Sequence, residues 1–366
     1  MMIRSRRALA LAAALAVLLA GCASAPGPVA SDTTVAADPL APLTGLEVLD
    51  EPRDWSGPST AVLADRPFPR LDGTPSQSLP VTVTSYDLGG STQQTVATAD
   101  RILPMDIAGS IAATVFGLGF GDRVVGRDIS TTFEEAADLP VITAGSHTIN
   151  IEAVIALRPD LVITDGSIGP IDVVLQLREA GITVVFVEND PSLDGVGTLT
   201  RQVAEALGAP DAGEQFAALL DEGIEAKLAE IQSILPPAEP LRMMFLYLRG
   251  GTGIYYLFGE ESGADALITA LGGIDVAADL GFEGMRPMTD EAMVAAAPEV
   301  ILLMSGGLAS AGGVDGLLEA KPAIALTPAG QQRRIVDMAD GDVLAFGPRT
   351  ADVLDALARA IYAPGQ

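Results

Sequence analysis

The order of apolar and polar positions along the chain predicts buried strands that alternate with helices. Two short runs, Leu161–Thr164 and Val300–Met304, carry apolar side chains on both faces. A strand has that pattern when helices cover its sheet on each side, which is typical of parallel sheets. Further apolar runs at 123–126, 183–187 and 243–248 alternate with helical stretches. The pattern therefore predicts an α/β fold.

An internal repeat divides this pattern into two similar units. Residues 151–163 align without gaps on residues 290–302. The identical positions are Glu152, Ala153, Ala156 and Pro159 in the first unit and Glu291, Ala292, Ala295 and Pro298 in the second. Each copy predicts a short helix, a proline that ends it and a buried strand, because proline cannot continue a helix interior. We therefore expect two Rossmann-like lobes.

A single long helix is predicted between the two units, over residues 212–235. Its apolar side chains recur at helical spacing from Phe216 to Leu235, and the segment ends just before two consecutive prolines. We therefore expect a first lobe at 79–211 and a second lobe at 236–366, joined by this helix. An alternating stretch at 81–96, with two glycines near its centre, predicts a hairpin on the first lobe.

The first 22 residues have the pattern of a secretory signal. Three arginines precede an apolar run over residues 8–20, which is shorter than the roughly 20 residues of a membrane-spanning helix. The small residues before Cys22 resemble a lipobox, at which bacteria attach lipid to the cysteine and cleave before it; the alternative is an ordinary buried cysteine. We expect residues 1–21 to be removed, and Cys22 to carry palmitate and anchor the protein to the outer face of the cell membrane.

The segment after Cys22 has a composition unlike that of the lobes. Residues 22–78 are rich in Pro, Ser, Thr, Ala and Asp and lack sustained periodicity. Such a composition cannot bury enough apolar surface to fold alone. We therefore expect a flexible tether.

Composition and charge exclude several classes of function. The 366 residues carry a net charge of −27, with one His and one Cys. Removing residues 1–21 takes away three arginines and no acids, which lowers the charge to −30. A chain this acidic would repel nucleic acid. One His and one Cys are too few to build an all-protein zinc cage, an iron–sulfur site or a disulfide scaffold.

Enzyme signatures are also missing from the sequence. It contains no Gly-x-Ser-x-Gly elbow, no Walker loop and no dinucleotide fingerprint. These absences count against an enzyme. A structural adhesin is a further alternative, and a stable complex with a membrane permease would count against it.

The lipobox, the tether, the two lobes and the connecting helix together resemble the helical-backbone class of substrate-binding proteins that serve ABC importers. Gly-Asp-Arg-Val-Val-Gly at 121–126 and Leu-Arg-Pro-Asp-Leu-Val at 157–162 are typical of that class. The resemblance implies a monomer that binds its ligand in a cleft between the lobes and delivers it to a permease and its ATPase. It also implies that Glu152 and Glu291 dock on the permease. The alternative for these glutamates is a favourable interaction with their helix dipoles.

Two local motifs resemble those of bacterial haem carriers within this class. The first is Ala-Gly-Ser-His-Thr-Ile-Asn at 144–150, which contains the only histidine, and the second is Met-Met-Phe-Leu-Tyr-Leu-Arg-Gly-Gly at 243–251. The resemblance assigns the axial ligands of a transported haem b to His147 and Tyr247. Imidazole and phenolate suit ferric haem. Because residues two apart on a strand share a face, Arg249 would lie beside Tyr247 and favour its phenolate.

Other residues and other ligands stay open at this point. Met304 is a candidate for contact with the porphyrin plane, and Arg286 or Arg349 could add a local cation. Either tyrosine of the pair at 255–256 could replace Tyr247 as the phenolate. A ferric siderophore or cobalamin carrier would share the fold and the docking glutamates without needing His147.

Overall fold

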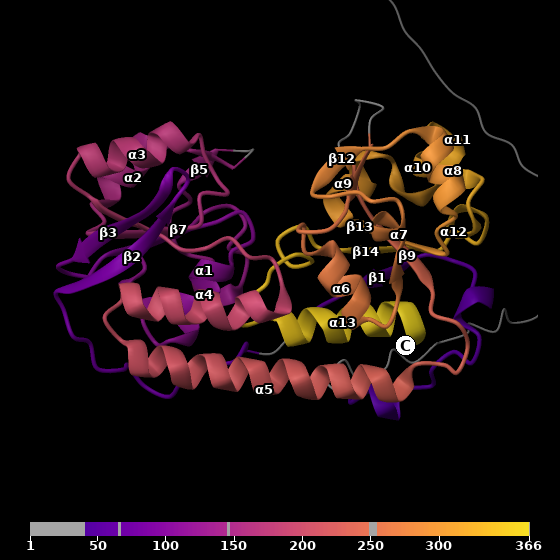
Figure 1. Cartoon of the computed structure of the whole chain (residues 1–366), viewed down its shortest axis with the longest axis horizontal. Helices are drawn as coiled ribbons and strands as arrows, with labels where there is room; N and C mark the ends of the chain where they lie inside the picture. The colour runs from indigo at the N-terminus through magenta and orange to yellow at the C-terminus, as the bar shows by residue number, and fades with distance from the viewer. Residues whose placement is uncertain (1–40, 65–66, 145–146, 249–254, 366) are drawn as a thin grey trace, which may run out of the picture. The chain divides into compact units, whose positions relative to one another are not determined.

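The computed structural model describes residues 41–64, 67–144, 147–248 and 255–365 (Figure 1). Residues 1–21, Cys22 and the first part of the expected tether lie outside these ranges. Within them, helices alternate with strands, and the central strands of both lobes run parallel. The α/β fold predicted from the sequence is therefore confirmed.

Three short strands form the central sheet of the first lobe. These are β4 (Ile102–Met105), β7 (Leu161–Thr164) and β8 (Thr183–Phe186), which run parallel in that order. One face packs on α2 and α3, and the other packs on α1 and α4 (Figure 1). The remaining elements of the lobe are α1 (Ser110–Gly117), η3 (Gly121–Arg123), η4 (Glu134–Ala136), β5 (Thr143–Ala144), β6 (Thr148–Ile149), α2 (Ile151–Leu157), α3 (Ile171–Glu179) and α4 (Leu193–Ala206).

The predicted hairpin is present as β2 (Val81–Asp87) and β3 (Gly90–Val96). An ion pair attaches it to the lobe: the guanidinium of Arg178 donates to both carboxylate oxygens of Asp87, at 2.8 Å each. Burial alone would raise the pKa of Asp87, but hydrogen bonds from Arg178, Ser85 and Thr92 hold the pKa below its ordinary value. The hairpin is thus fixed by a partly buried, bidentate pair.

The sheet of the second lobe is larger and mixed. Its central strand β9 (Arg242–Leu248) pairs in parallel with β13 (Val300–Met304), which pairs in parallel with β14 (Ile335–Met338). On the other side, β10 (Tyr255–Phe258) pairs antiparallel with β9. The next strand, β12 (Met285–Pro287), pairs antiparallel with β10. The other elements are α6 (Ala264–Ala270), β11 (Ile274–Asp275), α7 (Val276–Asp279), α8 (Asp290–Ala296), α9 (Ser305–Ser310), α10 (Gly313–Ala320), α11 (Pro322–Ala325), α12 (Pro328–Gln331) and α13 (Thr350–Tyr362).

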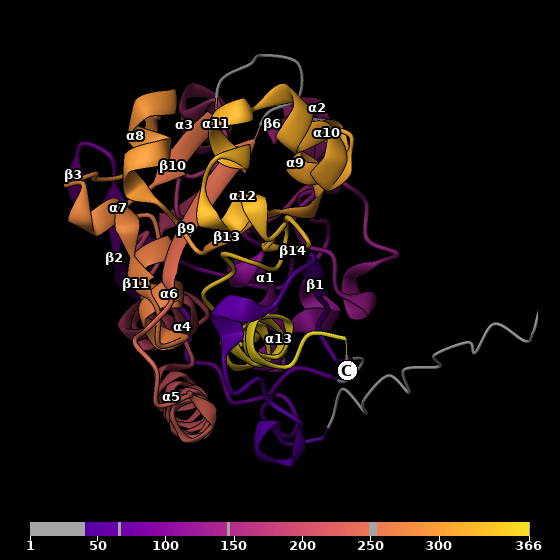
Figure 2. The same cartoon turned by 90° about the vertical axis from the view of Figure 1, so that its right-hand side faces the viewer.

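The long helix α5 (Pro210–Ile234) follows the first lobe and precedes the second. It begins two residues before the predicted start, because Pro210 suits the first turn of a helix. Most of its buried side chains, Phe216 among them, belong to one hydrophobic cluster that includes residues of both lobes. It lies beside α13 (Figure 2), where Lys227 forms an ion pair with Asp355 at 2.6 Å. The lobes therefore share a core along this helix.

The expected tether is wrong for the part of 22–78 that the structure describes. Residues 59–61 form strand β1 (Ser59–Ala61), which pairs in parallel with β14, and Leu43 is fully buried. Two turns, η1 (Leu43–Gly45) and η2 (Pro52–Asp54), precede β1. Further along, Leu71 N donates to Gly117 O in the first lobe. The segment is ordered because the lobes supply the apolar surface that its own composition lacks.

The internal repeat is confirmed as two matching helix–strand units, α2 with β7 and α8 with β13. The strand expected at 123–126 is wrong. Residues 121–123 form the turn η3, and only Val124 makes a single bridge, to Ile102. The chain turns away before a ladder can form. No helix in the described ranges is both long and apolar enough to cross a membrane.

Candidate functional site

A cavity of about 1060 Å³ is lined by residues of both lobes. This volume is slightly above the usual range for small-molecule sites, about 300–1,000 Å³, so the cavity suits a large ligand. Many of its walls lie at the carboxyl ends of parallel strands, where open α/β sheets bind their ligands. The lining residues at these ends are Asp106 and Ile107 after β4, Asp165 after β7, Glu188 after β8, Tyr247 in β9, Met304 at the end of β13, and Asp340 after β14.

His147 lines the cavity from the first lobe. It is half-buried in the turn before β6, with a φ of 57°, a left-handed conformation that histidine adopts more readily than most residues. Its Nδ1 lies 3.4 Å from Ser130 Oγ. Nε2 is therefore the ring nitrogen left for a ligand.

Tyr247 lines the same cavity from the second lobe. Its ring is nearly parallel to that of Phe258 on the neighbouring strand, with centroids 5.8 Å apart, and Phe258 also stacks on Phe245 at 5.3 Å. Such pairs contribute about 0.5–1.5 kcal/mol each beyond burial. The aromatic ladder therefore holds the Tyr247 ring in place while its half-buried side chain borders the cavity.

The two alternative tyrosines are placed differently from Tyr247. Tyr255 pairs with Leu248 in the ladder and points to the opposite face of the sheet, where its hydroxyl donates to Asp290 at 2.9 Å. Burial raises the pKa of Tyr255, and the hydrogen bond to Asp290 raises it further. Tyr256 lies directly across from Tyr247 on the same face but is not among the described residues that line the cavity. Tyr247 is thus the tyrosine that borders the cavity.

Of the other predicted site residues, Met304 and Arg349 line the cavity. Arg286 does not come to it. Arg286 pairs with Leu257, whereas its neighbour Met285 pairs with Phe258 and lines the cavity. Because side chains alternate along a strand, Arg286 lies on the other face, where its Nε donates to Glu283 O at 3.2 Å. Arg249 lies outside the described residues.

Acids predominate among the charged side chains of the described lining. Seven lining residues are acids, against one arginine, Arg349. Arg349 donates to Asp342 Oδ1 at 3.0 Å, so its charge is already partly balanced within the cavity. Burial raises the pKa of Asp342, and Arg349 opposes that rise. The described part of the cavity thus offers an anionic ligand little attraction from its overall charge.

A cluster of buried aspartates underlies the first-lobe wall. Asp106 accepts hydrogen bonds from the backbone N–H groups at the start of α1, and Asp128 accepts from the N–H groups of Ser130 and Thr131. Burial raises the pKa of Asp106 well above its ordinary value, and the charges of Asp128 and Asp165 raise it further. Burial likewise raises the pKa values of Asp128 and Asp165. These carboxyls therefore retain protons to higher pH than exposed aspartates, which lessens the negative charge of the wall.

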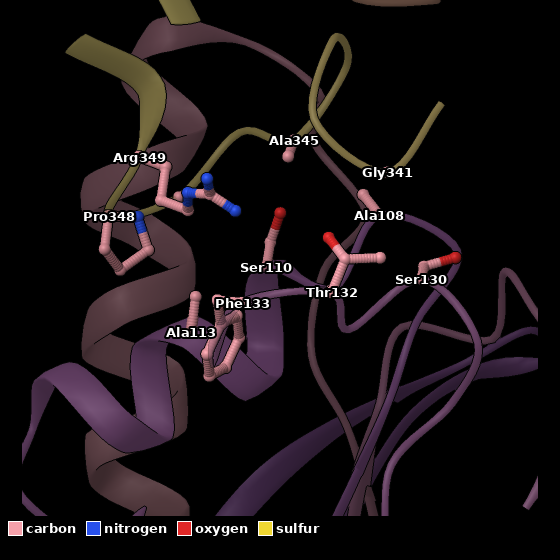
Figure 3. A pocket seen from close by; sticks show the side chains of 12 residues that line it. Ala108, Ser110, Ala113, Ser130, Thr132, Phe133, Gly341, Ala345, Pro348 and Arg349 are labelled. Carbon is pink, nitrogen blue, oxygen red and sulfur yellow. The ribbon is translucent and has the colours of Figure 1, made fainter. Parts of the chain in front are cut away.

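A narrow recess adjoins the main cavity where a loop of the second lobe meets the first (Figure 3). Arg349 and Ser110 lie on facing sides of it. A Cβ on Gly341 would lie 3.0 Å from Ser130 O, and one on Gly347 would lie 3.1 Å from the Ser110 side chain. Glycine at these positions therefore lets the loop approach the first lobe closely.

The two predicted docking glutamates are exposed and occupy equivalent places. Glu152 lies in the first turn of α2, and Glu291 lies in the first turn of α8. A side-chain cap precedes each: Asn150 Oδ1 accepts from Ala153 N, and Thr289 Oγ1 accepts from Ala292 N. Both positions also suit the helix-dipole alternative, because a first-turn acid interacts favourably with the helix dipole.

The metal-binding capacity of the described residues is small. No group of three or more His, Cys, Asp or Glu side chains among them is arranged to hold a metal ion. A haem iron differs from a bare ion because the porphyrin supplies most ligands and the protein adds only one or two. His147 and Tyr247 bring one imidazole nitrogen and one phenol oxygen to the cavity.

Several lining residues were not anticipated from the sequence. They include Phe258, Met285 and the acids Asp106, Asp165, Glu188 and Asp340. For the acids after β7 and β8, the available signal was a polar residue directly after a buried strand. Asp106 was missed because Ile102–Met105 was not predicted as a strand.

Comparison with known proteins gives consistent results. Residues 107–340, more than half of the chain, match the family model described as periplasmic binding protein. The uncharacterised ABC transporter substrate-binding lipoprotein YvrC of Bacillus subtilis is 28% identical over 249 residues, 68% of this chain and 76% of that protein. A cobalamin-binding protein of Halobacterium salinarum is also 28% identical, over 68% of this chain and 64% of its own length.

Solved structures add a likeness in three dimensions. The haem-binding protein HmuT is 38% identical with a TM-score of 0.79, and the match covers 85% of this chain and 99% of that one. The two-lobed fold is therefore that of known carriers, which deliver ligand to the permease and ATPase of an ABC importer. The chain belongs to the periplasmic binding protein family and is a substrate-binding protein of an ABC importer, not an enzyme.

Proposed function

We propose that the protein captures ferric haem and delivers it to an ABC permease for uptake of haem or iron. The observation that carries this proposal is the position of His147 and Tyr247, which line one large cavity from different lobes. A histidine nitrogen and a tyrosine oxygen form a workable axial pair for ferric iron. Phe258, Met285 and Met304 add apolar and polarizable surface for the macrocycle.

The likeness to HmuT supports the same ligand. Solved structures of HmuT include separate variants in which a histidine, a tyrosine and an arginine two positions after the tyrosine are replaced by alanine. The sequence here has the same three residue types, with Arg249 two positions after Tyr247. The shared Tyr-x-Arg spacing supports Tyr247 as the phenolate ligand of the proposal. Because the described lining is acidic, iron ligation and apolar contact carry the affinity.

Hemin titration of the purified protein tests this assignment. His147→Ala and Tyr247→Phe should each weaken hemin binding and move the Soret band. Tyr256→Phe is the matched control, because Tyr256 lies on the same face as Tyr247 outside the described lining. The assignment fails if neither variant alters the affinity or the spectrum. A Soret change in Tyr256→Phe alone would instead make Tyr256 the phenolate.

Cobalamin is the second candidate ligand, favoured by the cobalamin-binding relative. The cavity volume suits a corrin ring as well as a porphyrin. Parallel titrations with cyanocobalamin and hemin separate the two ligands. Tight cyanocobalamin binding that persists in His147→Ala and Tyr247→Phe, with weak hemin binding, would favour cobalamin.

We also propose that the protein acts as a monomer held at the outer face of the cell membrane by lipid on Cys22. The name of the lipoprotein relative and the lipobox-like residues support this. Labelling with radioactive palmitate should mark the wild type and not Cys22→Ser. Equal labelling of both would exclude Cys22 as the site.

Delivery completes the proposed function. The loaded carrier docks through Glu152 and Glu291, and release requires the lobes to separate far enough to break one axial bond. The two ligands belong to different lobes, which motivates this step. Hemin transfer at an undiminished rate with the lobes cross-linked would contradict it.

A further inference from the structure

Two exposed aliphatic side chains stand beside the two docking glutamates. Ile155 is 48% exposed on α2, and Val294 is 42% exposed on α8. Each follows its glutamate by three positions, and residues three apart lie on one face of a helix. Each lobe therefore presents a carboxylate with an apolar side chain one turn further along.

The two helices match in detail, so the aliphatic residues occupy equivalent places. Both helices begin after a side-chain cap and end at a non-glycine residue in left-handed conformation, followed by proline. The terminal residues are Arg158, with a φ of 47°, and Ala297, with a φ of 44°. Ala156 and Ala295, which follow the aliphatic residues, are also exposed and small. In each lobe, the docking glutamate therefore lies beside exposed apolar side chains of the same helix.

The fold itself does not account for Ile155 and Val294. Both are β-branched, a class that forms helices less readily than alanine or leucine, and neither belongs to the core. A single exposed aliphatic residue on a protein surface is common. The same acid–aliphatic pair at the same helix position in both lobes is a repeated surface feature, which fits a partner with two similar docking surfaces.

We propose that each lobe binds the importer through a two-part contact, in which the glutamate pairs with a basic residue of the permease and the aliphatic side chain packs on apolar surface beside it. This inference rests on the proposed docking of Glu152 and Glu291. An exposed ion pair alone contributes little, because water screens it. Apolar side chains packed over the same helix face exclude that water, which strengthens the attraction between the glutamate and the basic residue. For each lobe, the permease therefore presents a basic side chain next to an apolar surface.

Binding to the importer tests the proposal directly. The probe is the permease–ATPase complex that co-purifies with the full-length chain from its own membrane, reconstituted in nanodiscs. Ile155→Thr and Val294→Thr keep the branched shape but replace a hydrocarbon group by a hydroxyl. Each should weaken binding about three- to tenfold, and the double variant should weaken it more than either. Hemin affinity should not change.

The control is Leu219→Ser, since Leu219 is 42% exposed on α5, a helix that packs mainly on α4 and α13. It should bind the importer like wild type. A loss of binding in Glu152→Gln/Glu291→Gln but not in Ile155→Thr/Val294→Thr would overturn this inference and leave glutamate docking intact. Unchanged binding in both double variants would overturn glutamate docking as well. Micromolar self-association abolished by the threonine variants would make a second copy the occupant and overturn the proposal.

Discussion

Asp275 carries a buried carboxylate that should make the second lobe less stable at neutral pH. Its side chain is 8% exposed at the start of α7, where Oδ1 accepts from Ala277 N at 3.0 Å. Oδ2 is buried and has no hydrogen-bond partner among the described residues. Burial, together with the charges of Asp265 and Asp279, raises the pKa of Asp275 to about 6. We therefore predict that Asp275→Asn stabilises the protein at pH 7.

The sign and size follow from proton binding. An aspartate in the unfolded chain has a pKa of about 3.9, so between about pH 4 and pH 6 the folded protein binds a proton that the unfolded chain has lost. The contribution of Asp275 to stability therefore falls as pH rises through this window and stays low above it. A rise in pKa from about 3.9 to about 6 corresponds to about 3 kcal/mol. Most of it, about 2 kcal/mol, is the expected gain of Asp275→Asn at pH 7 relative to pH 4, because at pH 4 the unfolded aspartate is still about half protonated.

Urea denaturation at several pH values between 4 and 7.5, followed by circular dichroism, measures this gain. Each point is the free energy of unfolding of the variant minus that of wild type, which removes the pH dependence of all other groups. Asp275→Ser is the matched control, because it keeps a capping oxygen without an ionisable group and should show the same slope. A difference that stays constant from pH 4 to pH 7 would refute the reasoning. Hemin spectra should be unchanged, since the substitution lies away from the cavity.

Three further predictions concern an ion pair, the cavity charge and backbone strain. Arg178→Ala should lower the free energy of unfolding by about 3 kcal/mol in urea denaturation, because it leaves Asp87 partly buried without its partner; a loss below about 1 kcal/mol would contradict this. Asp342→Asn should tighten hemin binding about three- to tenfold at low salt, with a smaller gain at 0.5 M salt, because it frees Arg349 and removes one anionic charge; a Soret titration with equal affinities would count against it. Ala297→Gly should stabilise the protein by about 1 kcal/mol, because glycine adopts the left-handed conformation without strain; an unchanged or lower Tm would exclude that explanation.

The parts of the fold that were predicted correctly are those with strong local signals. The runs that became β7 and β13 are apolar at nearly every position and follow a proline, so their boundaries were read directly. The signal was weaker at residues 123–126. Two valines there resemble a strand, yet the neighbouring backbone offers only one bridge, from Ile102 to Val124. Whether a partner strand continues is a tertiary property that the local sequence does not contain.

For the cavity, too, residues with a local sequence signal were predicted correctly, and residues placed by strand pairing were not. His147 and Tyr247 were singled out by residue type and motif, and both line it. Arg286 was expected in the pocket, but the pairing of β12 with β10 turns it to the other face. That register depends on where two distant segments meet. The acids along the wall depend likewise on which strands end at the same edge.

Strand β1 has a consequence for the solubility of the carrier. It occupies the outer side of β14, so that the backbone N–H and C=O groups of β14 are paired on both sides. A chain shortened beyond residue 61 would leave β14 as an open outer strand, and such strands readily pair with other copies. We expect that shortened protein to aggregate. A segment with the composition of a linker therefore protects the second-lobe sheet from pairing with other copies.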